Sequence, residues 1–370
     1  MERKSSLENL VKMGFLNTYK GRKVLVTGHT GFKGGWLSLW LHHIGADVTG
    51  YSLDPEHPEG IFVLSDIGKK IKDYRGDIRD VNRLAEVFTN EKPEIVFHLA
   101  AQPLVLDSYN NPMETFETNI MGTANVLKAI TDSSTVKAAV MITTDKCYEN
   151  REQIWGYREN DAMGGHDPYS ASKGAAELII SSWRRSFCNK KNSPLIASAR
   201  AGNVIGGGDW CKNRLVPDIM RAILNNKDIE IRNPSATRPW QHVLEPLGGY
   251  LILGAALYEG HSEFASGWNF GPYPNEIYSV RRLLEKILEV SGRGAWIDKS
   301  DVEKKHEANI LTLDITKANI KLKWKPILTI NETIEMTLEW YLKFKDESVE
   351  ALSLKQIEFY KEVWKLRNGN

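Results

Sequence analysis

The chain has 370 residues, 42% of them hydrophobic, which is enough to bury the core of one large domain or of two closely packed ones. Its 48 basic and 47 acidic residues leave a net charge of +1, so nothing in the composition points to a nucleic acid or another polyanionic partner. The 3 cysteines lack metal-ligand spacing and no run approaches the ~20 apolar residues of a membrane span, which predicts a cytoplasmic protein with no disulfide framework, no metal and no membrane contact.

The first half of the chain, residues 21–202, alternates short β-rich apolar runs with helical patterns. The predicted strands are residues 23–27, 47–51, 95–99, 138–143 and 195–199. The predicted helices are residues 36–44, 81–89, 115–131 and 169–187. This alternation predicts an α/β fold with a Rossmann-type, doubly wound parallel sheet, whose ligands bind at the carboxyl edge of the strands.

Past Gly202 the regular alternation fades. Residues 217–224, 246–258, 280–291 and 333–345 are predicted helices, and 229–231 is a short strand. We therefore predict four parts: an N-terminal arm (1–20), a dinucleotide-binding Rossmann domain (21–203), a smaller, mixed α/β nucleotide-sugar-binding lobe (204–345) with some crossing of the chain between the lobes, and a C-terminal helical tail (346–370).

A glycine-rich motif follows the first predicted strand and opens a helix, the arrangement that receives a dinucleotide pyrophosphate. Gly28 permits a tight turn, Gly31 lets the backbone approach the phosphates, and Gly34 allows close packing of helix and sheet. The predicted cofactor contacts in this motif are Gly28, His29, Gly31, Phe32, Lys33 and Gly34.

Later segments are predicted to complete the cofactor site. Asp77-Ile78 is placed to meet an adenine edge, although a simple turn explains this aspartate equally well. Leu99-Ala100-Ala101 ends a strand with small residues, which suit a chain that passes beneath a cofactor. The remaining predicted contacts are Ser52, Gln102, Thr143, Tyr169 and Lys173.

The second predicted strand lacks the carboxylate that usually follows it and grips the adenosine ribose. It ends Gly50-Tyr51-Ser52-Leu53, and the first acid is Asp54. His29 and Lys33 either bring positive charge near the ribose or are ordinary exposed loop residues. The residues alone leave the choice between NAD and NADP open, and they allow a weak grip on NAD.

Tyr169-Ser170-Ala171-Ser172-Lys173 places a phenol and an amine on one face of a predicted helix, one turn apart. A phenol titrates near ~10, and a cation held beside it favours the phenolate. We therefore predict that Lys173 lowers the pKa of Tyr169, which acts as a general base. Together with the glycine motif, this pair predicts a nicotinamide-dependent enzyme.

Thr143-Thr144-Asp145-Lys146 comes at the end of the predicted strand 138–143, so its side chains project from the sheet edge where the nicotinamide is expected. Simple hydride exchange needs only a hydroxyl here, so the acid and the amine indicate a further proton-transfer step. The alternative is that Asp145 caps a turn and Lys146 is solvated.

These motifs together resemble the CDP-glucose 4,6-dehydratases, a nucleotide-sugar branch of the extended short-chain dehydrogenase/reductase superfamily. Many activities share the superfamily motifs, but the whole set is specific to the CDP-sugar branch. The resemblance covers about residues 21–326 and is carried by segments 27–34, 98–105, 144–150, 155–159, 167–170, 200–210, 238–243 and 267–272.

The resemblance implies that NAD serves a redox-neutral dehydration of CDP-D-glucose to CDP-4-dehydro-6-deoxy-D-glucose. C4 is oxidised, water is lost across C5 and C6, and the hydride returns to C6. Tyr169 would remove the 4-hydroxyl proton, with Lys173 orienting the cofactor ribose. Thr144 would hydrogen-bond the 4-oxygen and Asp145 would protonate the departing 6-hydroxyl. A lyase of O-antigen (lipopolysaccharide) dideoxysugar synthesis, and a homodimer that pairs helices near 115–131 and 169–187 in a four-helix bundle, are implied as well.

Lys146 stands where the dTDP-glucose branch carries a glutamate, a natural base for the C5 proton. A lysine titrates near ~10.4 and accepts a proton only if burial or nearby positive charge lowers its pKa. Oxidised nicotinamide and Lys173 would supply such charge. Alternatively, Lys146 stays cationic and stabilises the enolate. We slightly favour the base.

Arg238, Asn203 and Arg214 are predicted near the substrate pyrophosphate and nucleotide, because a guanidinium offers phosphate a rigid donor fork. Gln102 and His242 complete the predicted substrate contacts. The alternatives without substrate binding are a surface salt bridge for Arg214 and a packed structural role for His242.

Two positions depart from the family pattern: Leu106 and Tyr273 stand where relatives commonly carry arginine. Three other functions compete. A dehydratase of another nucleotide-sugar would share the whole site, whereas a 4-epimerase needs no Asp145–Lys146 pair. A non-catalytic, cofactor-binding regulator would typically have lost Tyr169 or Lys173.

Overall fold

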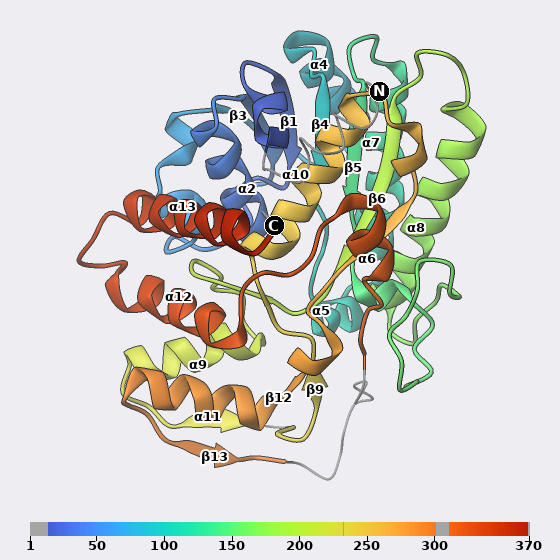
Figure 1. Cartoon of the computed structure of the whole chain (residues 1–370). Helices are drawn as coiled ribbons and strands as arrows, with labels where there is room; N and C mark the ends of the chain where they lie inside the picture. The colour runs from blue at the N-terminus through green and yellow to red at the C-terminus, as the bar shows by residue number, and fades with distance from the viewer. Residues whose placement is uncertain (1–13, 232, 301–310, 369–370) are drawn as a thin grey trace.

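The structure, a computed structural model, describes residues 14–231, 233–300 and 311–368 (Figure 1). Its centre is a parallel sheet of seven strands in the order β11-β6-β5-β4-β1-β2-β3. The predicted Rossmann-type α/β fold is therefore confirmed. The strands are β1 (Lys23–Thr27), β2 (Asp47–Ser52), β3 (Lys72–Arg75), β4 (Ile95–His98), β5 (Ala138–Ile142), β6 (Leu195–Ala201) and β11 (Gly267–Phe270).

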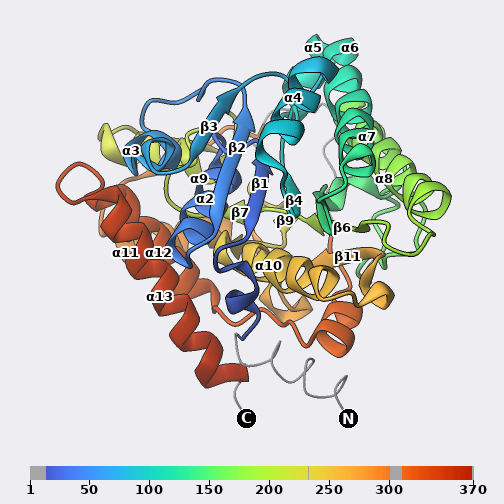
Figure 2. The same ribbon diagram turned by 90° about the horizontal axis from the view of Figure 1, so that it is seen from above.

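Helices cover both faces of the sheet (Figure 2), because successive strand residues point to opposite sides and both sides are apolar. Val24 and Val26 of β1 join a core with helices α2 (Phe32–His43) and α10 (Leu244–Tyr258). Leu25 faces the opposite way and joins a second core. That core is built with α4 (Val81–Glu91), α7 (Thr123–Asp132) and α8 (Pro168–Phe187).

Three features of the sheet domain differ from the predicted elements. Strand β3 is missing from the prediction because its Lys-Asp-Tyr-Arg sequence is polar and lies at the sheet edge. Strand β11 is missing because Asn269 interrupts its apolar pattern, yet this side chain is buried. The predicted helix 115–131 is divided into α6 (Pro112–Phe116), a π-helical turn η3 (Glu117–Gly122) and α7.

A smaller group of elements lies beside the carboxyl edge of the sheet (Figure 1). Short strands pair there as β8 (Ile229–Ile231) with β13 (Trp296–Asp298) and β9 (Thr237–Arg238) with β12 (Tyr278–Ser279). Helices α9 (Leu215–Leu224), α11 (Val280–Ser291) and α12 (Ile330–Lys343) accompany them. The helix predicted for the C-terminal tail is α13 (Val349–Asn368), which packs on α2 of the sheet domain.

Short elements connect these parts. They are α3 (Ile61–Leu64), α5 (Val105–Asn110), β7 (Val204–Ile205), β10 (Gln241–His242), η1 (Gly14–Tyr19), η2 (Ile67–Lys69), η4 (Asp145–Cys147), η5 (Ser262–Phe264), η6 (Pro274–Glu276) and η7 (Ala318–Leu322). The first 13 residues of the predicted N-terminal arm lie outside the described residues. Among the helices that the structure describes, none has the length and apolar character needed to cross a membrane.

Candidate active site

A cleft of about 2140 Å³ lies at the carboxyl edge of the sheet, between the strand ends and the smaller group of elements. Its lining brings together residues that are far apart in the sequence. All the predicted site residues line it except His29 and His242. The cleft therefore gathers the predicted cofactor, reaction and substrate residues in one place, as the edge of a parallel sheet does.

The glycine motif forms one wall of this cleft. Gly28 has a positive φ of 75°, and a Cβ there would lie 2.6 Å from the backbone nitrogen of Ala100. A Cβ on Gly34 would lie 2.0 Å from the carbonyl oxygen of Gly28. Neither position has room for a side chain, so the first turn of α2 sits close against β1 and β4 with its N-terminal end facing the cleft.

His29 does not bring charge to a ribose site, and it is not exposed. Its ring is buried, its Nε2 lies 2.8 Å from Oδ1 of Asp73, and its edge packs on Phe62. Burial lowers the pKa of His29, although Asp73 opposes this. Gly50 leaves room for the ring, because a Cβ there would lie 2.2 Å from it. His29 thus ties β1 to β3 beneath the cleft.

Lys33 is also misplaced by the prediction. Its side chain is partly buried toward the reaction end of the cleft, and desolvation there lowers its pKa to about 8. Arg214 and Lys173 lower the pKa further, whereas Asp145 raises it. The ribose end after β2 instead presents hydroxyl groups, with Oγ1 of Thr30 lying 2.8 Å from Oγ of Ser52. The expected positive charge therefore lies beside the reacting groups.

Helix α8 presents the Tyr-Lys pair. The Asp167 carboxylate caps the helix by accepting from the Ser170 amide at 2.9 Å, so Tyr169 lies in the first turn and Lys173 in the next. Burial raises the pKa of Tyr169 to about 12, while a hydrogen bond with Thr144 and the charge of Arg214 lower it. Burial also lowers the pKa of Lys173 to about 8.

The expected lowering of the Tyr169 pKa by Lys173 stays a prediction, because burial is the largest influence on the pKa of both groups. Two buried groups share the first turns of one helix, and burial disfavours the charged form of each. The groups that favour the Tyr169 phenolate come from elsewhere: Thr144 after β5, and Arg214 from the opposite wall.

Thr144, Asp145 and Lys146 follow β5 in the short helix η4. Thr144, not Asp145, caps this turn, because its Oγ1 accepts from the Lys146 amide at 3.3 Å. The same hydroxyl donates to Oδ1 of Asp145 at 2.9 Å. The other oxygen, Oδ2, is buried and has no hydrogen-bond partner among the residues described. Gly202 makes room for it, since a Cβ there would lie 1.8 Å away.

The substrate side of the cleft carries the predicted arginines. Nη1 of Arg214 donates to Oδ2 of Asp209 at 2.9 Å, and that carboxylate is buried. Arg238 is buried at the wall and donates to the carbonyl oxygen of Thr237. Asn203 adopts a left-handed conformation with φ of 43°. These three residues face one space from three different segments.

Two predicted substrate contacts are otherwise engaged. His242 is fully buried outside the cleft, accepts from the Leu244 amide through Nδ1 and packs on Trp36, so its assignment as a substrate contact is wrong. Burial lowers the pKa of His242 to about 3. The Gln102 side chain lines the cleft, but it donates to Oγ1 of Thr115 at 2.9 Å.

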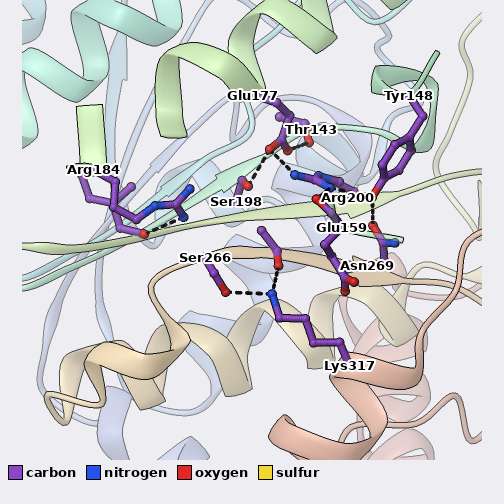
Figure 3. Close-up of polar contacts among 12 residues, drawn as sticks. Thr143, Tyr148, Glu159, Glu177, Arg184, Ser198, Arg200, Ser266, Asn269 and Lys317 are labelled. Carbon is purple, nitrogen blue, oxygen red and sulfur yellow. Dashed lines mark hydrogen bonds and ion pairs between the residues drawn. The ribbon is translucent and has the colours of Figure 1, made fainter. Parts of the chain in front are cut away.

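The structure also reveals polar groups that the sequence motifs do not indicate. A buried ion pair joins Glu177, one turn beyond Lys173 on α8, to Arg200 on β6 (Figure 3). In the sequence, the four-residue spacing of Glu177 from Lys173 was the signal that could have pointed to Glu177. At the cleft rim, ligand atoms of Glu56, His57 and Cys211 lie within 4.8 Å of one another, a grouping that the sequence did not indicate, and the absence of a metal stays a prediction. Burial raises the Cys211 thiol pKa to about 12, which opposes metal binding.

Comparisons with known proteins agree with this geometry. The chain matches the family model described as GDP-mannose 4,6 dehydratase over residues 25–256. It is 47% identical over 350 residues to the CDP-glucose 4,6-dehydratase of Salmonella typhimurium, an alignment that covers 93% of this chain and 97% of that protein. The chain belongs to the CDP-glucose 4,6-dehydratase family.

More distant relatives share the fold of this dehydratase family. The dTDP-glucose 4,6-dehydratase 1 of Escherichia coli is 26% identical over 346 residues, 86% of this chain and 92% of that protein. A dTDP-glucose 4,6-dehydratase of Streptomyces venezuelae, solved with NAD bound, has a TM-score of 0.75 at 21% identity and covers 87% of this chain and 97% of that one.

The residues of this CDP-glucose 4,6-dehydratase family member fit a dinucleotide. Gly28 and Gly34 have no space for a side chain, so the backbone itself forms the wall at the start of α2. The amide groups of that first turn favour a pyrophosphate. At the ribose end, Ser52 and Thr30 offer hydroxyls, and Asp54 is exposed and paired with Arg75.

Proposed function

We propose that the protein dehydrates CDP-D-glucose to CDP-4-dehydro-6-deoxy-D-glucose, with NAD as its cofactor. The observation that carries this proposal is the convergence of Tyr169, Thr144, Asp145 and Lys146 on one cleft. An acid and an amine beside the Tyr-Lys pair supply the proton transfers that elimination of water needs and that epimerisation does not. The 47% identity to a CDP-glucose 4,6-dehydratase supports CDP-glucose as the substrate.

NAD would be held by the glycine wall of α2, by Ser52, Asp77 and Ile78, and by the Leu99-Ala100-Ala101 segment. When bound, it supplies a reversible two-electron acceptor, so the overall reaction needs no other oxidant. Lys173 would orient its ribose. The choice of NAD over NADP agrees with the NAD named in structures of more distant relatives.

In this proposal Tyr169 takes the proton of the sugar 4-hydroxyl, and Thr144 hydrogen-bonds the same oxygen. Thr144 already lowers the pKa of Tyr169, which favours the phenolate that this step needs. Asp145 protonates the departing 6-hydroxyl, a role that fits its unpartnered buried Oδ2. Lys146 removes the C5 proton or, as a cation, stabilises the enolate that results.

Arg214, Arg238 and Asn203 would hold the pyrophosphate and the nucleotide. A guanidinium donates two parallel hydrogen bonds to phosphate oxygens, which fixes the sugar against Tyr169. Leu106 lines the cleft where relatives commonly carry arginine, so we place the phosphate contacts on the Arg214 side.

We further propose a homodimer. Met113 on α6, Met121 on η3 and Leu178 on α8 are exposed by 67%, 56% and 61%, an apolar surface that a second copy would cover through a four-helix bundle. The reaction product, a 4-keto-6-deoxy sugar, would serve dideoxysugar synthesis for O-antigen.

The test is to incubate the protein with NAD and, in separate reactions, with CDP-, dTDP-, UDP- and GDP-glucose. Formation of a 4-keto-6-deoxy sugar, followed by its alkaline ultraviolet absorbance, is expected from CDP-glucose. A galactose product would instead make the protein a 4-epimerase, and no turnover of any sugar would favour a binding role. Preferred turnover of another nucleotide-sugar would overturn the cytidine assignment.

A further inference from the structure

The residues proposed to act on the sugar stand on two separate segments. Tyr169 and Lys173 are carried by α8, whereas Thr144, Asp145 and Lys146 follow β5. The chemistry needs both sets on neighbouring atoms of one sugar, so the distance between the two segments has to be fixed. The contacts that fix it lie behind the cleft.

Glu177 makes the first set of these contacts. It lies eight residues beyond Tyr169 on the same face of α8, and its side chain is 3% exposed. Its carboxylate accepts from Oγ1 of Thr143 at 2.5 Å, from Oγ of Ser198 at 2.8 Å and from Nη2 of Arg200 at 2.7 Å (Figure 3). Because Thr143 directly precedes Thr144, Glu177 ties the helix to the end of β5.

Arg200 makes the second set. Its Nη1 donates to the Tyr148 hydroxyl at 2.6 Å and to the carbonyl oxygen of Glu159 at 3.0 Å, and its guanidinium lies over the Tyr148 ring. Tyr148 directly follows η4 and donates to Oδ1 of Asn269 at 2.7 Å. Gly267 leaves room for the guanidinium, because a Cβ there would lie 2.5 Å from Nη2. Arg200 therefore ties the far end of η4 to β6 and β11.

We propose that Glu177 and Arg200 are positioning residues, which hold the Tyr169–Lys173 face of α8 in register with the Thr144–Asp145–Lys146 segment. Neither residue lines the cleft, so neither acts on the sugar directly. The pair grips both ends of the segment 143–148 at once, through Thr143 and through Tyr148. This inference rests on the proposed function, which identifies the reaction whose residues the pair positions.

Glu177 also acts on Lys173 through its charge. Burial lowers the Lys173 pKa to about 8, and the Glu177 carboxylate opposes this by raising it. The other titratable groups around Lys173 are Cys147, whose charge raises the same pKa, and Lys33 and His98, on which the Lys173 cation acts. Losing the negative charge of Glu177 would therefore let Lys173 lose its proton at a lower pH.

The experiment compares Glu177→Gln with the wild-type protein on the nucleotide-sugar that the wild type consumes. We expect kcat to fall about 10- to 100-fold while KM changes by about twofold at most, because the geometry of reaction and not the cleft wall is altered. The alkaline limb of the kcat profile should move to lower pH, by roughly one unit. Glu245→Gln, another fully buried carboxylate outside the cleft, is the matched control and should keep the wild-type profile.

A second variant, Glu177→Gln with Arg200→Met, distinguishes a purely structural role of the pair from the positioning role. It leaves no buried cation without its partner. We expect this double variant to recover the thermal midpoint lost by the single one, yet to keep the low kcat and the displaced alkaline limb. Recovery of both would overturn the positioning role, as would a folded Glu177→Gln protein with wild-type kcat and pH profile. Failure of the wild type to turn over any nucleotide-sugar would count against the proposed function instead.

Discussion

Two buried regions of this molecule carry the same kinds of side chain and treat them differently. In the cleft, the Asp145 carboxylate leaves Oδ2 without a partner in the described part of the chain. Behind the sheet, the Glu245 carboxylate of α10 accepts from the amides of Ile327 at 2.7 Å and Leu328 at 2.6 Å, and from the Tyr360 hydroxyl at 3.1 Å. An unpaired buried polar atom costs stability, so its presence needs an explanation, and in the cleft the explanation we propose is its use in the reaction.

Two buried tyrosines, one in the cleft and one in the core, allow a similar comparison. They show that a missing hydrogen-bond partner does not by itself indicate function. Tyr169 and Tyr250 are both buried, and burial raises the pKa of each. The Tyr250 hydroxyl also has no hydrogen-bond partner among the described residues, yet it faces the core and not the cleft. An unpartnered atom therefore indicates function only where a ligand has access to it.

The largest expected effect comes from this pair of tyrosines. Tyr169→Phe removes the proposed base, so kcat should fall about 10³-fold or more, with little change in the thermal midpoint. Tyr250→Phe removes an equally buried hydroxyl and should leave kcat unchanged. Turnover of CDP-glucose and thermal unfolding of both variants measure this. Equal activity of the two variants would show that the Tyr169 hydroxyl in the cleft matters no more for turnover than the Tyr250 hydroxyl in the core.

Lys146→Met should lower kcat by about 10²-fold, because the C5 proton then lacks its base or its enolate lacks a stabilising charge. Entry of solvent deuterium at C5, followed by mass spectrometry, tests whether Lys146 acts at the step that removes this proton. A base predicts that exchange slows together with turnover. Exchange at the wild-type rate would refute both the base and the enolate-stabilising role.

Gly202→Ala tests whether the free oxygen of Asp145 matters. The new Cβ would lie 1.8 Å from Oδ2, so the carboxylate has to move. A displaced acid should lower kcat by about 10-fold or more, with a smaller effect on KM. Gly271→Ala is the control, because the nearest atom to a Cβ there is 3.6 Å away. Similar kcat values for both variants would show that the carboxylate tolerates displacement.

Much of the cleft was predictable from the sequence because its parts follow strand ends. The strands are continuous apolar runs, and the residues after them, such as Thr144 and Gly28, reach one edge whatever the details of packing. Lys33 and His29 were misplaced because the motif fixes the backbone and not the direction of its side chains. Neighbours distant in sequence set those directions: Asp73 for His29, and Asp145 and Arg214 for Lys33.

The positioning role proposed for Glu177 and Arg200 was not predictable for a related reason. Glu177 has a helical spacing from Lys173, but any exposed acid at that position would give the same pattern. Only the fold shows that Arg200, Thr143 and Ser198 surround it. Likewise, nothing local distinguishes His242 in a matching motif from a substrate contact. Its burial against Trp36 decides that it is structural.

The smallest expected effect lies in the region behind the sheet. Burial raises the pKa of Glu245 to about 7, although its three hydrogen-bond donors lower it. The folded protein therefore holds this proton at pH values where the unfolded chain, near ~4.3, has released it. The contribution of Glu245 to the free energy of unfolding is accordingly greatest in acid and declines as pH rises toward 7 and beyond.

Between about pH 5 and pH 8 this group alone should cost the wild-type protein about 2 kcal/mol of stability, measured by urea unfolding. Glu245→Gln can keep the same three contacts without a titrating proton, so its unfolding free energy should fall less over that range. Its kcat should stay within about twofold of wild type, because the residue lies outside the cleft. If the unfolding free energy of Glu245→Gln depends on pH as that of the wild type does, titration of Glu245 is not the cause of that dependence. A large loss of kcat would mean that the two regions are coupled, since the region behind the sheet would then govern the cleft.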